Sequence, residues 1–470
     1  MDSRRTFLQK VALSGLALTP VAGCSRSAVP PVAPPPPQAA GYCCIEVTEE
    51  GSGWPVPLVE LKTVHQQRFV TDNAGRIALD APELMGRETW FEVVGYGYSV
   101  KADGYGYQGF RLTPDYGKTL KIAVRRDIKA RRIGRLTGAG LFGESQKTGD
   151  FKEVPESGVF GCDSIQSAIY NEHKFWIWGD TSIAKYPLGI FDASAATTAV
   201  MPFTAFEPPL NLPFRHFRDS AGQVRGVAPI SGSGPTWLSG LVSLPDSSGR
   251  CHLCAMYAKI TPPLSAYECG LCVWNDTAER FERIAVIWSK SAATPACPLM
   301  PDGHPALWTD SVGHNWALFG NPLPTMRCPA TFEAWRNPRM WEPLTPQEKI
   351  PSADARESVK PHSGSIAWNS FRKRWVTVFV QHFGKPAAFG EVWYAEADTP
   401  TGEWHNAIKI LSHGNYTFYN PRIHPDCTPD DAPFLLFEGT FASTFADKPA
   451  IVPRYDYNQL LYRFDLPQGL

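Results

Sequence analysis

Short apolar runs separated by polar turns dominate the chain from about residue 130 to its end. Five of them recur as aromatic-rich stretches after a polar turn, in residues 173–180, 250–257, 314–320, 373–379 and 432–439. Aligned on Phe175, Leu253, Trp316, Trp375 and Phe434, they are 78, 63, 59 and 59 residues apart. A unit of roughly 60 residues can hold four strands, and five such repeats are typical of a β-propeller. The pattern predicts a five-bladed β-propeller over residues 131–470, with a series of β-sandwiches as the alternative.

Each recurring stretch has one candidate strand before it and another after it. The preceding runs, which would form the innermost strands of the blades, are residues 163–170, 236–244, 304–312, 363–369 and 419–424. The following runs, which would form the third strands, are residues 186–192, 267–274, 326–335, 389–397 and 458–464.

Residues 42–130 show similar alternation on a smaller scale, with apolar runs at 44–47, 56–61, 91–94 and 120–124. The stretch from Val70 to Leu79 has an Asp-x-x-Gly turn between two apolar runs, and an apolar segment from Val93 to Tyr98 follows it. This arrangement resembles the transthyretin-like module of carboxypeptidase-regulatory domains and implies a small β-sandwich. It shows no convergent acids or nucleophile, so we interpret it as a spacer or an ancillary carbohydrate-contact module. The predicted fold class is all-β, a small β-sandwich followed by a five-bladed β-propeller.

The first 24 residues have the pattern of an export signal. Arg4 and Arg5 precede an apolar run that is shorter than the roughly 20 residues of a membrane-spanning helix, which is typical of a twin-arginine (Tat) signal. The run ends in Val-Ala-Gly-Cys24, which resembles the lipobox of bacterial lipoproteins; simple cleavage beside an incidental cysteine is the alternative. Residues 25–41 are proline-rich and would form a stiff spacer. We expect a Tat-exported protein with a lipid anchor on Cys24, in the outer membrane because Ser25, not an aspartate, follows the cysteine.

Charge and cysteine content narrow the range of functions. The chain has 45 basic and 46 acidic residues, which excludes the basic surface of a nucleic-acid-binding protein. Ten cysteines remain besides Cys24, in a compartment that permits disulfides. Two Cys-x-x-Cys pairs, at 251–254 and 269–272, have the spacing of a zinc site. Residues three apart in a strand point to opposite faces, so we favour buried thiols or a disulfide over zinc, and we expect no cofactor.

Blade geometry predicts which side chains line the central funnel. The start of the first strand, the end of the second and the start of the third share one rim. Five carboxylates satisfy this rule: Asp163, Asp180, Glu268, Glu391 and Glu438. Crowded carboxylates shift one another's pKa values, and glycoside hydrolysis needs two acids with different pKa values. Asp163 is the strongest candidate, whereas Asp180 is equally well explained as a turn cap.

A second set of residues is predicted to hold a sugar at the same rim. Its members are aromatic or polar residues near the ends of predicted inner strands: Trp237, His304, His362, Tyr419, Asn420 and His424. Three of them, His304, His362 and His424, could instead form a metal site, which would indicate a metal-dependent carbohydrate lyase or an oxidoreductase.

The stretch from Asp163 to Thr181, in which an aspartate precedes a Trp-Gly-Asp-Thr strand end, resembles five-bladed propeller glycosidases. Within them it is similar to the family of formerly unknown function that includes endo-D-arabinanases. The resemblance implies a glycoside hydrolase acting on extracellular polysaccharide, with Asp163 and Asp180 as its acid pair. Serine follows Asp163 where arabinan- and xylan-side-chain hydrolases have proline, which leaves their inverting mechanism open. A non-catalytic surface glycan-binding lipoprotein with the same fold is the alternative.

Overall fold

The computed structural model describes residues 41–470 except 138–139, 153–156, 386, 447–450 and 468–470. Residues 41–470 form a single compact unit, so the predicted division at residue 131 stays a prediction. The predicted signal sequence, Cys24 and nearly all of the proline-rich spacer lie outside the described residues.

The first two sheets confirm the predicted β-sandwich. One has the order β4-β1-β8-β6, and the other has the order β3-β2-β5-β7. Their strands are β1 (Cys43–Glu49), β2 (Glu60–Thr63), β3 (Arg68–Val70), β4 (Arg76–Leu79), β5 (Thr89–Val94), β6 (Tyr98–Ser99), β7 (Gly109–Leu112) and β8 (Thr119–Arg126), with the short 3-10 helix η1 (Pro82–Leu84) between β4 and β5. The turn at residues 71–75 connects β3 to β4 and carries the chain from one sheet to the other, while alternating residues of both sheets share one core.

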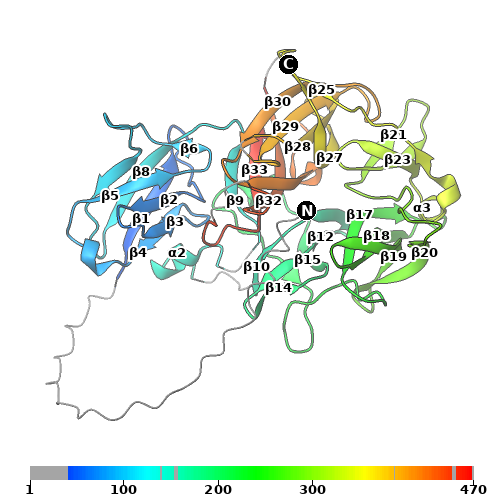
Figure 1. The fold of residues 1–470 in the computed structure, drawn as a ribbon, viewed down its shortest axis with the longest axis horizontal. Helices are drawn as coiled ribbons and strands as arrows, with labels where there is room; N and C mark the ends of the chain where they lie inside the picture. The colour runs from blue at the N-terminus through cyan, green and yellow to red at the C-terminus, as the bar shows by residue number, and fades with distance from the viewer. Residues whose placement is uncertain (1–40, 138–139, 153–156, 386, 447–450, 468–470) are drawn as a thin grey trace, which may run out of the picture. The chain divides into compact units, whose positions relative to one another are not determined.

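Five four-stranded antiparallel sheets confirm the predicted propeller (Figure 1). Blade 1 is β11 (Gln166–Tyr170), β12 (His173–Trp178), β15 (Ser194–Ala199) and β16 (Arg215–His216). Blade 2 is β17 (Thr236–Pro245), β18 (Cys251–Thr261), β19 (Ser265–Asn275) and β20 (Arg280–Ser289). Blade 3 is β21 (Ala306–Thr309), β22 (Asn315–Gly320), β23 (Pro324–Pro329) and β24 (Glu342–Pro343). Blade 4 is β27 (Pro361–Asn369), β28 (Arg374–Gln381), β29 (Glu391–Ala397) and β30 (Trp404–Ser412).

Blade 5 closes the ring with strands from both ends of the propeller. It consists of β31 (Thr417–Ile423), β32 (Phe434–Ala442), β33 (Asn458–Asp465) and, as its outermost strand, β9 (Arg131–Arg135). Leu460 pairs with Arg135 and Arg463 pairs with Arg131. A strand from the start of the propeller therefore completes the last blade, so unfolding of one end would open the ring.

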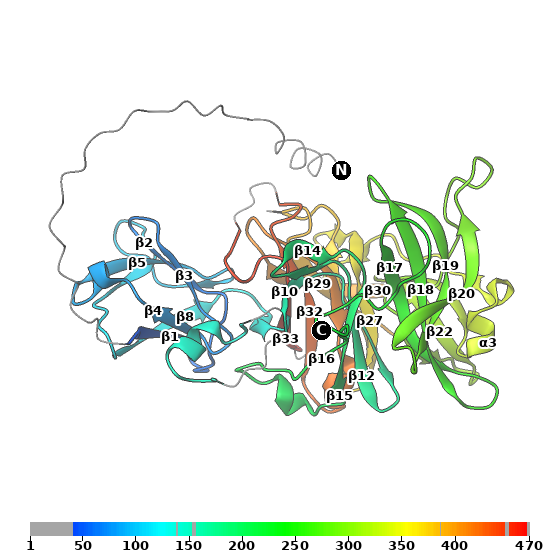
Figure 2. The same cartoon turned by 90° about the horizontal axis from the view of Figure 1, so that it is seen from below.

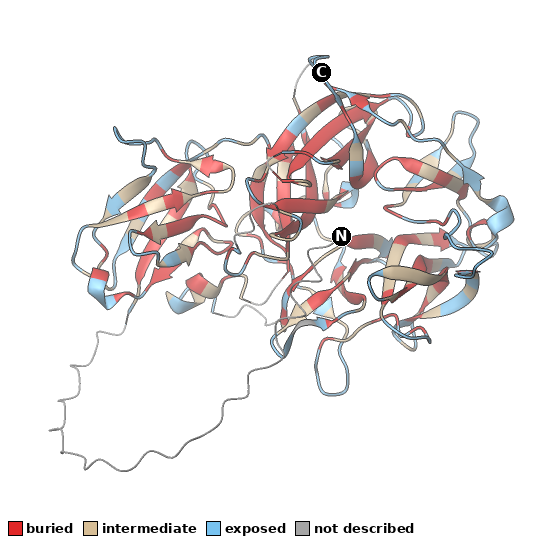
Figure 3. Cartoon of the chain, viewed as in Figure 1, coloured by how far each residue is buried: buried red, intermediate tan, exposed pale blue. Residues whose placement is uncertain are grey.

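Aromatic and aliphatic residues fill the spaces between the blades. Figure 3 shows the middle strands of blades 4 and 5 buried along most of their length, whereas the outer strand of blade 2 is largely tan and pale blue. Helices are minor: the described part of the chain holds α2 (Gly143–Lys147), α3 (Phe332–Trp335) and the 3-10 helices η2 (Phe203–Phe206), η3 (Pro338–Met340) and η4 (Pro425–Cys427). None of these described helices is long and apolar enough to cross a membrane. A small hairpin, β25 (Ile350–Pro351) with β26 (Ser358–Val359), precedes blade 4.

Two predicted third strands were wrong. Residues 186–192 do not belong to blade 1. They fall mainly in an inserted hairpin of β13 (Thr181–Ile183) and β14 (Tyr186–Ile190), which forms a separate sheet with β10 (Val159–Cys162). This sheet is seen beside blade 1 in Figure 2. The third strand of blade 1 is β15, which the Ala- and Thr-rich sequence did not reveal. In blade 3 the strand β23 ends at Pro329, and the predicted continuation to Trp335 is the helix α3, whose N-cap Thr331 accepts a hydrogen bond from the Ala334 N–H.

The four cysteines with zinc-like spacing do not converge. Cys254 and Cys269 pack in one hydrophobic cluster, Cys272 packs in another, and Cys251 is exposed. Within each Cys-x-x-Cys pair, the two side chains point to opposite faces of their strand, so the four thiols do not meet.

Candidate functional site

Three aspartates lie in a row where the inserted sheet joins blade 1. The strand β10 runs through Asp163 toward β11, β12 runs through Asp180 into β13, and β14 runs through Asp192 into β15. On one side of the row, Cys162 is the strand partner of Thr181, and Thr181 is the partner of Ile190. On the other side, Gln166 is paired with Ile177, and Trp178 with Ser194. The three aspartates therefore lie on neighbouring segments of chain, side by side, with Asp180 in the middle.

Asp163 and Asp180 are in direct contact through the backbone of the Gly179-Asp180 turn. The Gly179 N–H donates to the Asp163 carbonyl at 2.8 Å, and the Asp180 N–H donates to the Asp163 carboxyl. A Cβ atom at Gly179 would lie only 2.4 Å from Oδ1 of Asp163. Glycine is thus the residue that lets the turn approach the Asp163 carboxyl.

Two tyrosines of blade 5 lie against Asp163. The Tyr419 hydroxyl donates to Oδ2 of Asp163 at 2.9 Å, and the Tyr457 hydroxyl lies against the same carboxyl. Burial raises the pKa of Asp163 above its ordinary value, and the nearby hydroxyls of Tyr457 and Tyr419 lower it in part. The same burial, together with the charge of Asp163, raises the pKa of both tyrosines, so their hydroxyls stay protonated and remain donors.

Asp192 was missed in the sequence because the third strand of blade 1 was misplaced. Its Oδ1 accepts from the backbone N–H groups of Ala193 at 2.9 Å and Thr236 at 3.2 Å. Burial raises the pKa of Asp192 to about 7, although these hydrogen bonds and the charge of Lys259 lower it. A partly exposed carboxyl that holds its proton near neutral pH is suited to act as a general acid.

The propeller axis below the acid row is crossed by Arg422. A bulge in β31 after Tyr419, with Asn420 at φ 52° and Pro421 following, shifts the register of the strand. Arg422 then donates from Nε to the Ser167 hydroxyl of blade 1 at 2.9 Å and lies 3.2 Å from Nδ1 of His304, beside blade 3. Asn420 donates from Nδ2 to the Ser164 hydroxyl at 2.9 Å. These contacts fix Tyr419 and Asn420 at the level of Asp163.

Glu438, predicted at the end of a strand, instead lies in the middle of β32 and is fully buried. It is 2.7 Å from Nε2 of His424, whose Nδ1 lies 3.0 Å from the Lys174 ammonium. Since Lys174 can only donate, Nε2 carries the imidazole hydrogen and donates to Glu438. Burial raises the pKa of Glu438 to about 8 and lowers that of His424. This cluster belongs to the packing of blade 5 on blade 1, and Glu438 is not one of the acids of the row.

The same cluster contains the one arrangement of metal-binding residue types found among the described residues, His424 with Asp426 and Cys427. The Lys174 ammonium lies 2.5 Å from Asp426 and 3.3 Å from the Cys427 sulfur, besides its contact with His424. A cation of the chain itself therefore occupies the space between the three ligands. The predicted alternative of a metal site from His304, His362 and His424 was wrong, because the three imidazoles contact Arg422, Phe389 and Glu438 respectively.

The remaining predicted acids are paired away from the row. Glu268 accepts from the Tyr257 hydroxyl at 2.8 Å and from Arg283 at 3.0 Å within blade 2. Glu391, at the start of β29, is bound to the Lys409 ammonium at 2.6 Å. Because Glu268 and Glu391 are each paired within their own blade, and Glu438 lies in the cluster with His424, the five predicted carboxylates do not share one cluster.

Two predicted aromatic positions lie on the rim. Trp237, at the start of β17, packs edge-on against Phe191 with ring centroids 6.2 Å apart, and Phe191 immediately precedes Asp192. His362, at the start of β27, lies 4.4 Å from the Phe389 ring. The acid row of blade 1 thus has aromatic residues toward blade 2 on one side and toward blades 5 and 4 on the other.

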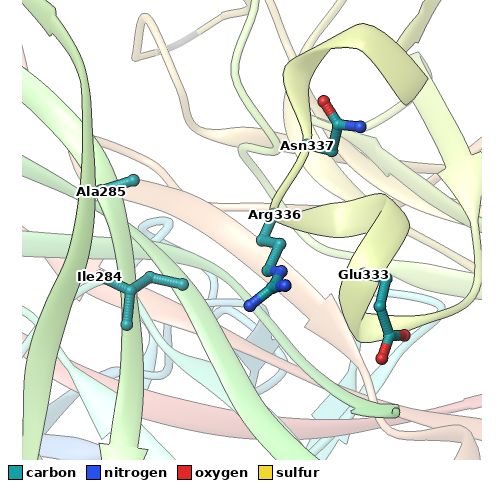
Figure 4. Close-up of a pocket in the computed structure, with 5 residues that line it drawn as sticks. All are labelled: Ile284, Ala285, Glu333, Arg336 and Asn337. Atoms are coloured by element: carbon teal, nitrogen blue, oxygen red, sulfur yellow. The ribbon is translucent and has the colours of Figure 1, made fainter. Parts of the chain in front are cut away.

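Two hollows in the described surface lie away from the acid row. One, of about 480 Å³, is lined by Ile284, Ala285, Glu333, Arg336 and Asn337, between β20 and α3 (Figure 4). A much smaller one lies beside Trp54 and Phe434. Neither of these two hollows is lined by an acid of the row. The convergence of titratable groups marks the candidate site.

Comparisons with known proteins find distant structural similarity alone. No family model matches the chain, and no curated protein matches it. Among solved structures it is similar to an exo-1,5-α-L-arabinanase from a bovine ruminal metagenomic library, with 10% identity, a TM-score of 0.36, and coverage of 65% of this chain and 93% of the other.

Two further structures are comparably distant. A putative exo-β-1,3-galactanase from Bifidobacterium bifidum has 11% identity and a TM-score of 0.39 over 73% of this chain and 94% of its own. The β-xylosidase RS223 has 9% identity and a TM-score of 0.37 over 66% and 93%. The strand order of the five sheets, and not these distant likenesses, defines the propeller.

Proposed function

We propose that the chain is a glycoside hydrolase whose acids are Asp163, Asp180 and Asp192. The observation that carries the proposal is the row itself: three carboxyls on adjacent strands of one blade, two of them with raised pKa values and one of these with a pKa of about 7. Glycosidic cleavage requires one acid that gives a proton to the leaving oxygen and one carboxylate that acts as nucleophile or activates water.

Within this proposal Asp192 is the proton donor and Asp163 is the base. Asp192 keeps its proton to about pH 7. Burial raises the pKa of Asp163 as well, and the nearby Tyr457 and Tyr419 hydroxyls oppose part of that rise, so the role of Asp163 as base is assigned from its position across the row from Asp192. The two acids flank the strand that carries Asp180, and two strand spacings amount to about 9.6 Å. This backbone spacing is closer to the roughly 6.5–9.5 Å between the carboxyls of inverting glycosidases than to the roughly 5–5.5 Å of retaining ones, so within the proposal we expect inversion, with a water between Asp163 and the sugar.

The test is release of reducing ends from a panel of soluble arabinan, xylan, β-1,3-galactan and levan. Wild-type protein is expected to cleave at least one polymer, and Asp163→Asn or Asp192→Asn to lower kcat by about 10²–10⁴-fold. The matched control is Asp431→Asn, an exposed aspartate before β32. Equal activity of the Asp163→Asn and Asp431→Asn variants would refute the assignment, as would a panel that stays uncleaved.

The second candidate is a non-catalytic glycan-binding protein with the same fold, in which the rim aromatics Trp237 and Phe191 would contact a sugar without cleavage. Retention by a polymer without any release of reducing ends would support it over the hydrolase. For both candidates we propose the same location: export by the Tat route, a lipid on Cys24 and attachment to the outer membrane, with the proline-rich segment as spacer.

A further inference from the structure

A continuous path of aromatic rings leads from the acid row across the rim of blades 5 and 4. Tyr419, which bonds Asp163, lies 5.9 Å from Phe445, and Phe445 lies 5.8 Å from Phe389. Phe389 in turn lies 6.3 Å from Phe383, in a stacked geometry. His362 and His382 border the end of this path, 4.4 Å from Phe389 and 4.2 Å from Phe383.

The path lies on the same rim as the acids. His362 belongs to the start of the first strand of blade 4, His382 and Phe383 follow the end of the second, and Phe389 precedes the third. These are the positions at which blade 1 carries its aspartates, and antiparallel blades bring such positions to one rim.

The outer rings of the path are open to solvent. Phe383 is 68% exposed and Phe445 is 49% exposed, whereas Tyr419 at the inner end is buried. Exposed phenylalanines joined into one patch are unusual on a protein surface, and they indicate a binding site more often than a packing fault. Their continuity with Asp163 indicates which ligand they would meet.

We propose that the exposed rings of Phe445 and Phe383, supported from beneath by Tyr419 and Phe389, form an extended subsite for a neutral polysaccharide chain that runs outward from the acid row. Phe445 packs edge-on against Tyr419 and Phe389, and Phe389 stacks on Phe383, so the inner rings hold the two exposed rings in place. The exposed rings of Phe445 and Phe383 can each pack against the apolar face of a sugar. Partial burial lowers the pKa of His362, so that imidazole is uncharged at neutral pH, which suits an uncharged ligand. The proposal rests on the hydrolase or glycan-binding function above, and it predicts preference for long chains over single sugars.

Native gels cast with soluble arabinan, xylan, β-1,3-galactan, levan or polygalacturonate provide the test with the full chain. Phe383→Ala and Phe445→Ala are compared with Phe371→Ala, an exposed phenylalanine in the turn at the opposite end of blade 4. We expect a neutral polymer to retard the wild type and the Phe371→Ala control equally, with an apparent Kd about tenfold weaker, or about 1.4 kcal/mol, for each of the other two variants. Unchanged melting temperatures would show that all three variants are folded.

The outcomes separate this subsite from the proposed reaction. Hydrolysis of a polymer with unchanged KM in the Phe383→Ala and Phe445→Ala variants overturns the subsite and leaves the acid row intact. Retention that these two substitutions abolish, in a protein that releases no reducing ends, supports the subsite and overturns the hydrolase. Retardation by polygalacturonate alone, which the exposed Lys385 beside Phe383 would favour, overturns the assignment to a neutral chain, as does retardation by no polymer.

Discussion

Gly179→Ala tests the geometry of the acid row without removing any acid. The added methyl carbon would lie 2.4 Å from Oδ1 of Asp163, and an ordinary contact requires 3.4 Å or more. The carboxyl must therefore move by about 1 Å, which disturbs the hydrogen bond that its Oδ2 accepts from the Tyr419 hydroxyl. A misplacement of this size at a reacting group lowers rates by about 100-fold.

The assay is kcat on whichever polymer the wild type cleaves, together with a thermal melt. Gly414→Ala is the control, because a methyl group there meets no atom within 4 Å. We expect kcat to fall about 100-fold in Gly179→Ala, with a smaller relative change in KM, and both parameters to stay unchanged in Gly414→Ala. Full activity of Gly179→Ala would refute the placement of Asp163 in the reaction, and loss of the folded state would show a structural role for the turn instead.

Four further predictions concern pH, stability and location. Asp192 must be protonated to act, so kcat is expected to fall as the pH rises through about 7, and a pH profile of Asp192→Asn should lack that limb. Glu438 binds its proton more tightly in the folded than in the unfolded chain, so the stability that this group contributes is present at acidic pH and is lost as the pH rises toward 8. In urea melts, Glu438→Gln should therefore show a smaller fall in the free energy of unfolding over this pH range. Asn73→Ala removes three buried hydrogen bonds, to the N–H and C=O of Arg135 and to the Leu210 carbonyl. It should lower the free energy of unfolding by about 2–4 kcal/mol in the same melts, and an unchanged midpoint would contradict these contacts. Cys24→Ala should move the protein from the membrane to the soluble fraction, and continued membrane association would refute lipidation.

The repeat of apolar strands was sufficient to predict the propeller because each blade needs a buried second strand, and such strands are the most hydrophobic segments of the sequence. The same criterion misplaced the third strand of blade 1. The inserted strand β14, with Tyr186 and Ile190, resembles a blade strand more closely than β15, whose sequence Ser194–Ala199 is rich in small residues. Tertiary pairing, not local propensity, decides between the two.

The candidate site was predictable only in part. The proximity of Asp163 and Asp180 follows from their places at strand ends, which the sequence reveals. Asp192 was hidden by the misplaced strand, and Tyr457 occupies an equivalent strand start in blade 5 that offered no further signal. The partners of Glu268, Glu391 and Glu438 depend on which faces of neighbouring strands meet, and apolar periodicity does not contain that information.

Proton NMR of the anomeric region during digestion of the cleaved polymer tests the central claim most directly, because it reports both cleavage and stereochemistry. With Asp192 as proton donor and Asp163 as base, the first new signals should belong to the anomer opposite to the linkage in the polymer, and they should be absent with Asp163→Asn. First-formed product with the original anomeric configuration would contradict the pairing of Asp163 with Asp192. Equal product formation by wild type and Asp163→Asn would contradict the acid row as the site of the reaction.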